Sequence, residues 1–397
     1  MFNSLTPLPA DPILGLLTAY REDPHPQKVD LGVGVYKDAT GHTPILDCVK
    51  AAEQQRTDTE TTKVYISPTG SAQFNQLMTE LAFGQRHQAL LADRIKTVST
   101  PGGTGALRVA AEFIHHCKPN AVIWVSDPTW ANHTALFEAA GLTVKTYPYY
   151  DYDSKSIKFE QMTAALKNIA KDDVVLLHAC CHNPSGMDLT PAQWDEVIAI
   201  TAEQGFTPLI DMAYQGFGDG IDEDAYGVRQ MAAAVEELIL CSSCSKNFGL
   251  YRERIGACSL MANDSVKANI ALSVMLYVIR GIYSMPPAHG AALVETILDN
   301  TELRLQWQQE LAVMRNRINS NRQMLVNKLL EKGVKQDFNF IARQKGMFSF
   351  LGINPSQVAT LKKEHSIYMV DSSRISIAGI SEGNVDYLAQ SIASILR

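Results

Sequence analysis

The sequence has only a small excess of acidic residues, and neither sign of charge is gathered into a long run or tail. Its 397 residues include 35 basic and 42 acidic side chains, with a formal net charge of −7, and 46% of them are hydrophobic. Because neither a basic patch nor a charged tail is present, nucleic acid and anionic membranes are not expected as partners. The length and the apolar content are typical of a globular protein with two or three domain-sized units.

Targeting signals and disulfide patterns are also missing. The first residues lack a basic segment followed by an apolar one, and no uninterrupted apolar run is long enough to span a bilayer. Cysteine is scarce, with seven residues in a chain of 397, and this odd number does not suggest the disulfide framework of a secreted protein. We therefore expect a cytoplasmic protein with reduced thiols.

Patterns that would bind a metal ion are weak. Segment 178–186 contains two histidines beside the adjacent Cys180 and Cys181, and Cys241 and Cys244 form a second close pair. Adjacent ligands cannot easily share one tetrahedral ion, and no second cluster has the spacing of a zinc site. We interpret segment 178–186 as a strand end leading into a turn, and we predict no metal.

Short apolar runs alternate with helical patterns over residues 46–300. This alternation is typical of strands joined by crossover helices in a mainly parallel sheet, which makes the fold class α/β. Sheets of this type bind ligands beyond their strand ends. The candidate strands are Ala121 to Val125, Val174 to His178, Pro208 to Asp211, Leu238 to Ser242 and Gly256 to Met261.

The last third of the chain predicts a long helix and a second domain. Apolar residues recur at helical spacing from Glu302 to Lys332, which indicates one amphipathic helix that links two domains. Two strand candidates, 347–350 and 373–377, lie on either side of a helical stretch around 357–365. The predicted domains are a large one of residues 46–305 and a smaller α/β one made of residues 1–45 and 306–397.

A glycine-rich turn, Pro101-Gly102-Gly103-Thr104-Gly105, precedes a helical pattern. Such a turn presents free backbone N–H groups at the positive end of the helix dipole, where a phosphate fits. A tight turn without a ligand is the alternative. The dinucleotide-binding pattern is excluded because Arg108 stands where the third glycine would fall.

A lysine, several hydroxyl groups and an arginine lie just beyond the candidate strand Leu238 to Ser242. They belong to segment 242–254, which includes Ser243, Lys246 and Arg254. Most lysines are solvated surface groups, but this clustering favours convergence on one phosphorylated ligand.

Asp211 ends another candidate strand, and Tyr214 follows it by three residues. A buried aspartate is costly unless it is paired, so a cationic partner such as a protonated ring nitrogen would suit it. A capping aspartate is the alternative explanation for this residue.

Taken together, these segments resemble the aspartate and aromatic amino acid aminotransferases, which are class I, fold-type I enzymes dependent on pyridoxal phosphate. The resemblance runs in order along nearly the whole chain. The matching segments are Gly32-Val33-Gly34-Val35-Tyr36, residues 102–105, Asp127-Pro128-Thr129-Trp130, His182-Asn183-Pro184, Asp211 with Tyr214, Ser245-Lys246-Asn247-Phe248-Gly249, and Ser373-Arg374.

The resemblance implies the fold and the cofactor site. The large domain would hold a mainly parallel seven-stranded sheet flanked by helices. Lys246 would carry the cofactor as a Schiff base and then act as base and acid at the substrate Cα, with Asp211 paired to the pyridine nitrogen. The other implied cofactor contacts are Asn183 and Tyr214 at the ring oxygen, Trp130 stacked on the ring, and Gly103, Thr104, Ser243, Arg254 and Tyr65 of the partner subunit at the phosphate.

The resemblance also implies the substrate contacts and a homodimer with shared active sites. Arg374 would bind the substrate α-carboxylate with a bidentate fork, helped by Gly34, Asn183 and Trp130. Arg280 would come from the partner subunit and face the substrate side chain. The small-molecule substrates would be amino acids and 2-oxo acids.

Several positions depart from the aspartate-selective pattern. Val64, Ile282 and Met285 stand where such relatives usually carry asparagine, which would loosen the hydrogen bonds that hold Arg280, and Ser372 precedes Ser373 where Ser-Gly is usual. Val35, Lys37 and Thr43, by contrast, match the aspartate enzymes. We therefore expect a broad enzyme that acts on phenylalanine, tyrosine, tryptophan and aspartate with 2-oxoglutarate; strict aspartate selectivity is the alternative.

Three other functions fit the sequence less well. A different pyridoxal-phosphate reaction, such as β-elimination or decarboxylation, would use much of the same cofactor site but not the substrate contacts of Arg374. A non-enzymatic binding protein would be expected to lack Lys246, Arg280 or Arg374, and all three are present. An NAD-linked dehydrogenase would need the glycine fingerprint that is missing.

Overall fold

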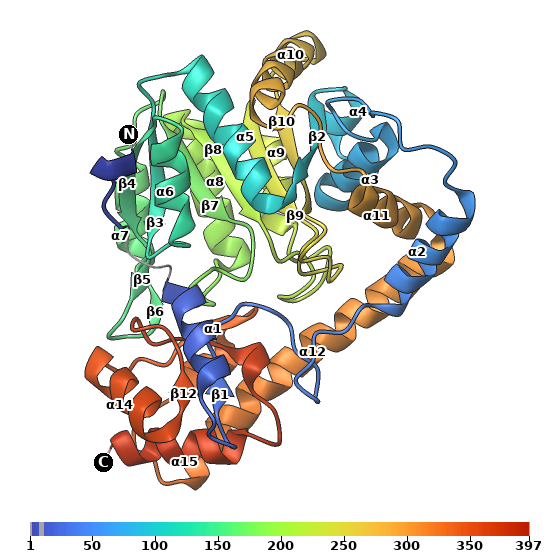
Figure 1. The fold of residues 1–397 in the computed structure, drawn as a ribbon. Coiled ribbons are helices and arrows are strands. Elements are labelled where there is room, and N and C mark those ends of the chain that lie inside the picture. The colour runs from blue at the N-terminus through green and yellow to red at the C-terminus, as the bar shows by residue number, and fades with distance from the viewer. Residues whose placement is uncertain (1, 8–11, 397) are drawn as a thin grey trace. The chain divides into compact units, whose positions relative to one another are not determined.

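The computed structural model describes residues 2–7 and 12–396 (Figure 1), and the chain forms two compact units. Unit 1 consists of Met1–Thr43 and Arg317–Arg397, and unit 2 of Pro44–Asn316. The division between them falls inside one continuous helix, α12 (Thr301–Glu331). The sequence analysis placed this boundary at 305/306, because a helix without glycine or proline offers no signal of where a domain ends.

Unit 2 is built on a seven-stranded sheet with strand order β2-β10-β9-β8-β7-β3-β4. β10 runs antiparallel to both of its neighbours, and the other adjacent pairs are parallel. The predicted mainly parallel α/β sheet is confirmed. The strands are β2 (Ile95–Pro101), β3 (Val122–Asp127), β4 (Thr143–Pro148), β7 (Val174–His178), β8 (Thr207–Met212), β9 (Leu238–Ser243) and β10 (Ile255–Met261).

The sequence analysis did not predict β2 and β4, which form the two edges of this sheet. The first four of the six β4 residues are exposed or only partly buried, whereas β9 and β10 are buried along their whole length. A strand covered on both faces needs a continuous apolar run, but an edge strand does not. The edges therefore lacked the pattern that revealed the central strands.

Helices cover both faces of the sheet. On one face, a buried apolar cluster joins α5, α6 and α10 to alternate side chains of the strands, such as Leu176 and Ile239. On the other face, where α3 and α9 pack, Leu177 and Leu240 are buried. The helices of unit 2 before α12 are α2 (Asp47–Thr59), α3 (Ala72–Phe83), α4 (Gln88–Leu91), α5 (Gly102–Cys117), α6 (Asn132–Ala139), α7 (Phe159–Leu166), α8 (Pro191–Gln204), α9 (Tyr226–Ala234), α10 (Ser265–Ile282) and α11 (His289–Asp299). A small antiparallel pair, β5 (Tyr150–Asp151) and β6 (Ser156–Ile157), completes the unit.

Unit 1 holds two two-stranded sheets, parallel β1–β12 and antiparallel β11–β13. Phe350 of β11 lies opposite Arg374 of β13, so the two predicted strands of the last third pair with each other. The elements are η1 (Phe2–Ser4), α1 (Pro12–Glu22), β1 (Val29–Asp30), α13 (Asn339–Arg343), β11 (Phe348–Phe350), α14 (Pro355–His365), β12 (Ile367–Tyr368), β13 (Arg374–Ser376), η2 (Ile377–Gly379) and α15 (Val385–Ile395).

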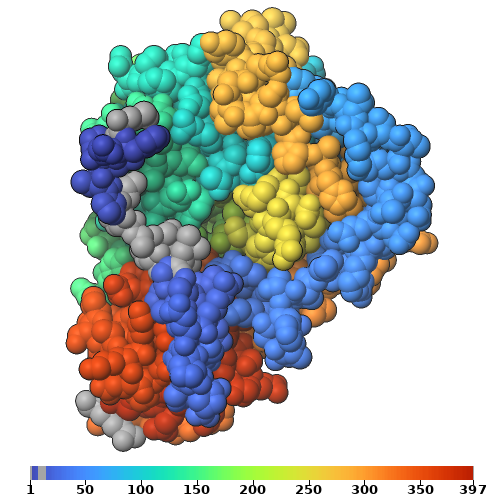
Figure 2. Space-filling view, viewed as in Figure 1, coloured from blue at the N-terminus to red at the C-terminus, as the bar shows by residue number. Residues whose placement is uncertain are grey.

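Helix α10 has an unusually apolar surface. By length and composition it could cross a bilayer, which the sequence analysis did not single out, and only 22% of it is buried in the structure. Val266, Ile270, Tyr277 and Ile282 of this helix are exposed. In Figure 2 the corresponding orange surface lies at the top of the view. An exposed apolar face of this kind is typical of a surface that packs against another protein chain.

Candidate active site

The candidate residues of unit 2 gather at one edge of the large sheet. The parallel strands β2, β7, β8 and β9 all end there, and they lead into Gly102, His178, Asp211 and Ser243. Because β10 is antiparallel, its start lies at the same edge, which brings Arg254 there too. This edge is the expected ligand site of an open α/β sheet.

Lys246 follows β9 by three residues and is partly buried. Its Nζ lies 4.6 Å from the centroid of the Tyr214 ring. Burial lowers the pKa of Lys246 from 10.5 to about 8, although Asp211 acts in the opposite direction, and Arg254 adds to the lowering. The neutral amine, which is the nucleophilic form, is therefore much more populated near neutral pH than in a surface lysine.

Asp211 is a buried carboxylate near the end of β8, with 8% of its surface exposed. Its Oδ2 accepts a hydrogen bond from Nε2 of His133 at 3.1 Å. Burial by itself raises the pKa of Asp211, but the hydrogen bond from His133 and the nearby Lys246 outweigh it, and the pKa lies below its ordinary value. Asp211 is consequently an anion that can pair with a cationic ligand group.

A chain of polar contacts runs from Asp211 through His133 and Thr129 to His178. Oγ1 of Thr129 lies 2.8 Å from Nδ1 of His133 and 3.2 Å from Nε2 of His178. Burial lowers the pKa of His178 to about 3, with His133 acting in the same direction. Since His178 is neutral, it can accept or donate in this chain without adding a buried charge.

The start of α5 lies beside Arg254 and Ser243, and together these groups could hold an anion. The first N–H groups of a helix have no partner within it and carry a positive dipole. A Cβ at Gly102, where φ is +74°, would lie 2.3 Å from Nη2 of Arg254, and a Cβ at Gly103 would lie 3.0 Å from Cβ of Ser243. Only glycine lets the guanidinium and the hydroxyl approach the helix start this closely. Thr104, the next predicted residue, is exposed in the first turn of α5.

Asn183 and Trp130 come from the segments that follow β7 and β3. Asn183 is buried, and Trp130 packs edge-on against His133 with ring centroids 5.2 Å apart. The turn before Asn183 is held by Asp188, whose carboxylate accepts from the backbone N–H groups of Cys181 and His182 at 2.6 and 2.8 Å.

In unit 1, Arg374 is buried and fixed in position. Its Nη2 donates to the Gly32 carbonyl at 2.7 Å, and its Cζ lies 4.4 Å from the centroid of the Phe348 ring. A Cβ at Gly34 would lie 2.5 Å from Cζ of Phe348, so this position requires glycine. Gly34 and Arg374 therefore both lie against the Phe348 ring.

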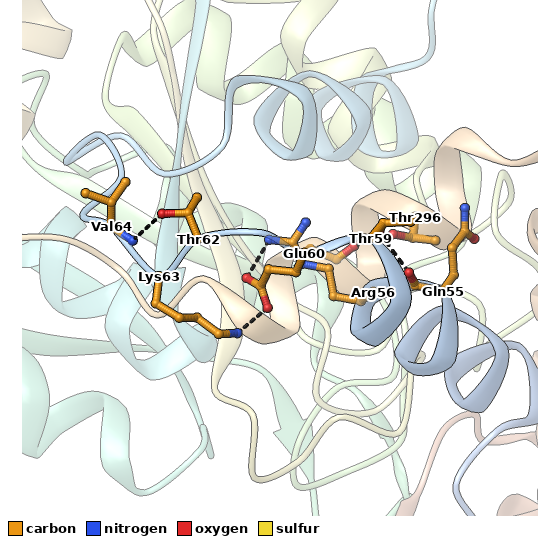
Figure 3. Close-up of polar contacts among 9 residues, drawn as sticks. Gln55, Arg56, Thr59, Glu60, Thr62, Lys63, Val64 and Thr296 are labelled. Carbon is orange, nitrogen blue, oxygen red and sulfur yellow. Dashed lines mark hydrogen bonds and ion pairs between the residues drawn. The ribbon is translucent and has the colours of Figure 1, made fainter.

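Tyr65 and Arg280 are exposed on unit 2, and Arg280 donates to Ser284 of its own helix end. Tyr65 has 87% of its surface exposed. Figure 3 shows how the segment before it is held: Glu60 accepts from Nη2 of Arg56 at 2.8 Å and from Lys63. An aromatic residue this exposed on an anchored segment is suited to contact another chain.

The sequence analysis missed two residues that shape these sites. His133 has no motif of its own, although its place four residues after Thr129 at the start of a helix could have suggested a shared face. Arg322 is 1% exposed in unit 1, and its guanidinium donates to four backbone carbonyls, those of Ile341, Lys345, Gly346 and Phe348. One signal was available in the sequence: Arg322 lies four residues after Ile318 and three before Leu325, on the apolar stripe of the predicted helix.

The arrangement fits pyridoxal phosphate. A helix start with an arginine and a hydroxyl can hold the phosphate, a partly buried lysine with a lowered pKa can bind the aldehyde, and a buried anion can pair with the ring nitrogen. The close approach at Gly102 and Gly103 is the feature that this fit requires. A family model for aminotransferase class I and II matches residues 26–392.

The chain belongs to the class I and II aminotransferase family. It is similar to an aspartate aminotransferase of Salmonella typhi, with 49% identity over 100% of both chains, and to an aromatic-amino-acid aminotransferase of Pseudomonas aeruginosa, with 49% identity over 99% of this chain and 98% of the relative. The solved structure of an aromatic-amino-acid aminotransferase from Burkholderia pseudomallei, covalently bound to pyridoxal phosphate, matches 100% of both chains with 42% identity and a TM-score of 0.98.

These findings confirm the predicted fold type, the aminotransferase class and pyridoxal phosphate as the cofactor of this enzyme. The family matches extend through both compact units, so the aminotransferase fold accounts for nearly the whole chain.

Proposed function

We propose that this aminotransferase transfers the amino group of phenylalanine, tyrosine, tryptophan or aspartate to 2-oxoglutarate by a ping-pong mechanism. The observation that carries the proposal is that Arg280 is exposed and that its guanidinium donates to Ser284 of its own chain. By the resemblance, Val64, Ile282 and Met285 stand where aspartate-selective relatives carry asparagine, and their side chains form no hydrogen bonds. An arginine held by few partners can bind a second carboxylate or move aside for a ring. Relatives of both specificities are equally similar.

We assign the catalytic steps to Lys246, Asp211 and Tyr214. Pyridoxal phosphate, when bound, withdraws electrons from the substrate Cα. Nζ of Lys246 would hold the cofactor and would act as base and then as acid toward the Cα proton. Asp211, kept ionised by His133, would pair with the protonated ring nitrogen, and the Tyr214 hydroxyl would bind the ring oxygen.

The proposal includes the remaining cofactor contacts in unit 2. Gly103, Thr104, Ser243 and Arg254 would bind the phosphate at the start of α5, because this is where the free N–H groups and the guanidinium meet. Asn183 would donate to the ring oxygen. Trp130, which lies beside His133, would stack on the ring and shield it from water.

Arg374 binds the substrate α-carboxylate through a bidentate fork in this proposal. Its contacts with Gly32 and Phe348 fix the guanidinium before substrate arrives, so little side-chain entropy is lost on binding. Gly34, Trp130 and Asn183 complete the substrate contacts. A carboxylate held in this way favours cleavage of the Cα–H bond over loss of the carboxyl group.

We further propose a cytoplasmic homodimer with shared active sites. Tyr65 and Arg280 are exposed on the chain that carries them, and the apolar face of α10 ends at Arg280. Burying that face against a second copy would remove it from water and offer Tyr65 and Arg280 to the neighbouring active site.

Steady-state kinetics of aspartate, tyrosine and phenylalanine with 2-oxoglutarate test this function. We expect turnover of all three, and activity confined to aspartate would contradict the broad specificity. Val64→Asn restores a partner for Arg280 and should lower kcat/KM for phenylalanine relative to aspartate by about tenfold, the worth of one hydrogen bond to a charged group. Val313→Asn, at another exposed valine, is the matched control.

A further inference from the structure

Three buried side chains of unit 2 form a cluster that the transamination mechanism does not use. Cys180, Cys181 and Asp224 are 5%, 2% and 6% exposed. Their two sulfur atoms and a carboxylate oxygen all lie within 4.8 Å of one another. A carboxylate and two thiols brought together away from solvent form an unusual group, because charged and polar atoms are costly to bury without a partner.

The backbone explains how two adjacent cysteines can face the same point. In an extended strand, neighbouring side chains point to opposite sides. Cys181 instead has a φ of +51°, a left-handed conformation that reverses this alternation. Asp188 holds the turn by accepting from the N–H of Cys181 and the N–H of His182. The sequence analysis predicted no metal here because adjacent ligands cannot easily share one tetrahedral ion and no second cluster has the spacing of a zinc site.

Asp224 supplies the third group from a distant part of the chain. Its carboxylate accepts from the backbone N–H groups of Gly216 at 2.8 Å, Gly218 at 2.9 Å and Asp219 at 2.9 Å. These bonds fix the carboxylate and leave it without a basic side chain within 4.0 Å in residues 2–7 and 12–396. The negative charge of Asp224 is thus balanced only by backbone dipoles.

We propose that Cys180, Cys181 and Asp224 bind one soft divalent cation of the Zn²⁺ or Cd²⁺ type. On binding, one M²⁺ joins the two sulfur atoms and the carboxylate, and the two thiol protons are released to solvent. The net charge of the cluster, including the enclosed ion, stays at −1. Ligand atoms on one tetrahedral zinc ion lie roughly 3.4–3.8 Å apart. Side-chain rotation of the cysteines can close the 4.8 Å separations to this range.

Occupation of this site should inhibit the aminotransferase. Asn183 follows Cys181 by two residues, and the backbone that holds Asp224 begins at Gly216, two residues after Tyr214. Drawing the three ligands together would therefore shift both segments that carry proposed cofactor contacts. This consequence rests on the proposed function, but the binding of the ion does not.

Cadmium titration of the holoenzyme tests the proposal. We expect one Cd²⁺ per chain by equilibrium dialysis, sulfur-to-metal absorbance in the ultraviolet, and release of two protons per ion in weakly buffered solution. Cys180→Ser and Cys181→Ser should each weaken binding by at least about 100-fold, since even the loss of an outer contact costs 10–100-fold. Cys117→Ser, at the exposed cysteine, is the control and should bind normally.

Two results would overturn the site. One is binding that survives Cys180→Ser and Cys181→Ser but disappears in Cys117→Ser, and the other is no bound ion in the unmodified protein. X-ray absorption of the Cd²⁺-loaded unmodified protein covers the case of variants that do not fold: two sulfur ligands support the site, and one or none contradicts it. These measurements need no turnover, so they test the metal site even if the proposed function is wrong.

Discussion

At the scale of single residues, the candidate active site contains two ionisable groups whose surroundings move their pKa values. Lys246 is deprived of water until its pKa falls to about 8, while Asp211 keeps its charge in spite of burial because His133 donates to it. In the proposed mechanism, Lys246 would serve as the nucleophile and Asp211 as the anion that pairs with the ring nitrogen. Both effects come from neighbours that are distant in the sequence.

Asp211→Ala should reduce turnover far more than cofactor affinity. At an effective dielectric of about 20 and roughly 4 Å, the attraction between Asp211 and a protonated ring nitrogen is about 4 kcal/mol, or on the order of three pK units. We expect kcat to fall by about three orders of magnitude. The kcat and the cofactor dissociation constant should be measured together, with Asp211→Glu as the charge-retaining control; near-normal turnover in Asp211→Ala would refute the assignment.

The rate at which the apoprotein takes up pyridoxal phosphate should depend on pH through Lys246. Only the neutral amine attacks the aldehyde, so below the pKa the rate should rise about tenfold per pH unit and level off above about pH 8. Stopped-flow absorbance of cofactor binding measures this profile. A midpoint near 10.5, the ordinary value for lysine, would show that the side chain is not desolvated.

At the scale of elements, α12 contributes side chains to both compact units. One of its residues contacts the segment beside Lys246 in unit 2, and another binds backbone carbonyls in unit 1. In unit 2, Trp307 stacks on Phe248 with centroids 4.5 Å apart and donates to the Asn247 carbonyl at 2.7 Å, directly beside Lys246. In unit 1, Arg322 of the same helix holds the turn before β11. The helix thus fixes one neighbour of Lys246 and the strand that carries Phe348.

Arg322→Met should destabilise unit 1 without touching any proposed cofactor contact. The substitution leaves four carbonyls without their buried donor, and each unpaired polar group costs about 1–3 kcal/mol, so we expect a loss of roughly 3 kcal/mol or more in the free energy of unfolding. Urea denaturation measures it. Arg343→Met, at an exposed arginine of α13, is the control, and equal effects of the two substitutions would contradict a special role for Arg322.

At the scale of the whole molecule, the exposed apolar face of α10 and the exposed Tyr65 and Arg280 are explained together by a second copy of the chain. In a monomer the apolar side chains of α10 would stay in water and contribute no stability. Tyr65 and Arg280 would also face solvent and not an active site. The proposed dimer therefore accounts for features of the surface that neither compact unit requires by itself.

Ile270→Glu should prevent this assembly. A charge placed on the apolar face of α10 would have to be buried without a partner, so we expect a monomer by light scattering together with loss of activity. Leu305→Glu is the matched control, since both side chains are 54% exposed. A dimer that persists in Ile270→Glu would exclude this face of α10 as the interface.

The sequence predicted the parts of this protein that have a local signature. The apolar runs of β7, β8 and β9, the periodic helix α12 and the glycine turn at the start of α5 were all recognisable, because buried strands, amphipathic helices and tight turns each restrict their own residues. The ordered motifs then identified the aminotransferase family and its cofactor.

Only the tertiary structure decided which distant groups meet. The hydrogen bond from His133 to Asp211, the carbonyls around Arg322, and the approach of Asp224 to Cys180 and Cys181 join residues through turns and crossovers that no local pattern encodes. Edge strands β2 and β4 were not predicted because an edge strand needs no continuous apolar run. The predicted domain boundary at 305/306 and the division between the compact units at 316/317 both lie inside α12. Helices, strands and turns depend mainly on neighbouring residues, so the sequence reveals them. The pKa values and the buried clusters depend on distances that exist only after the chain has packed.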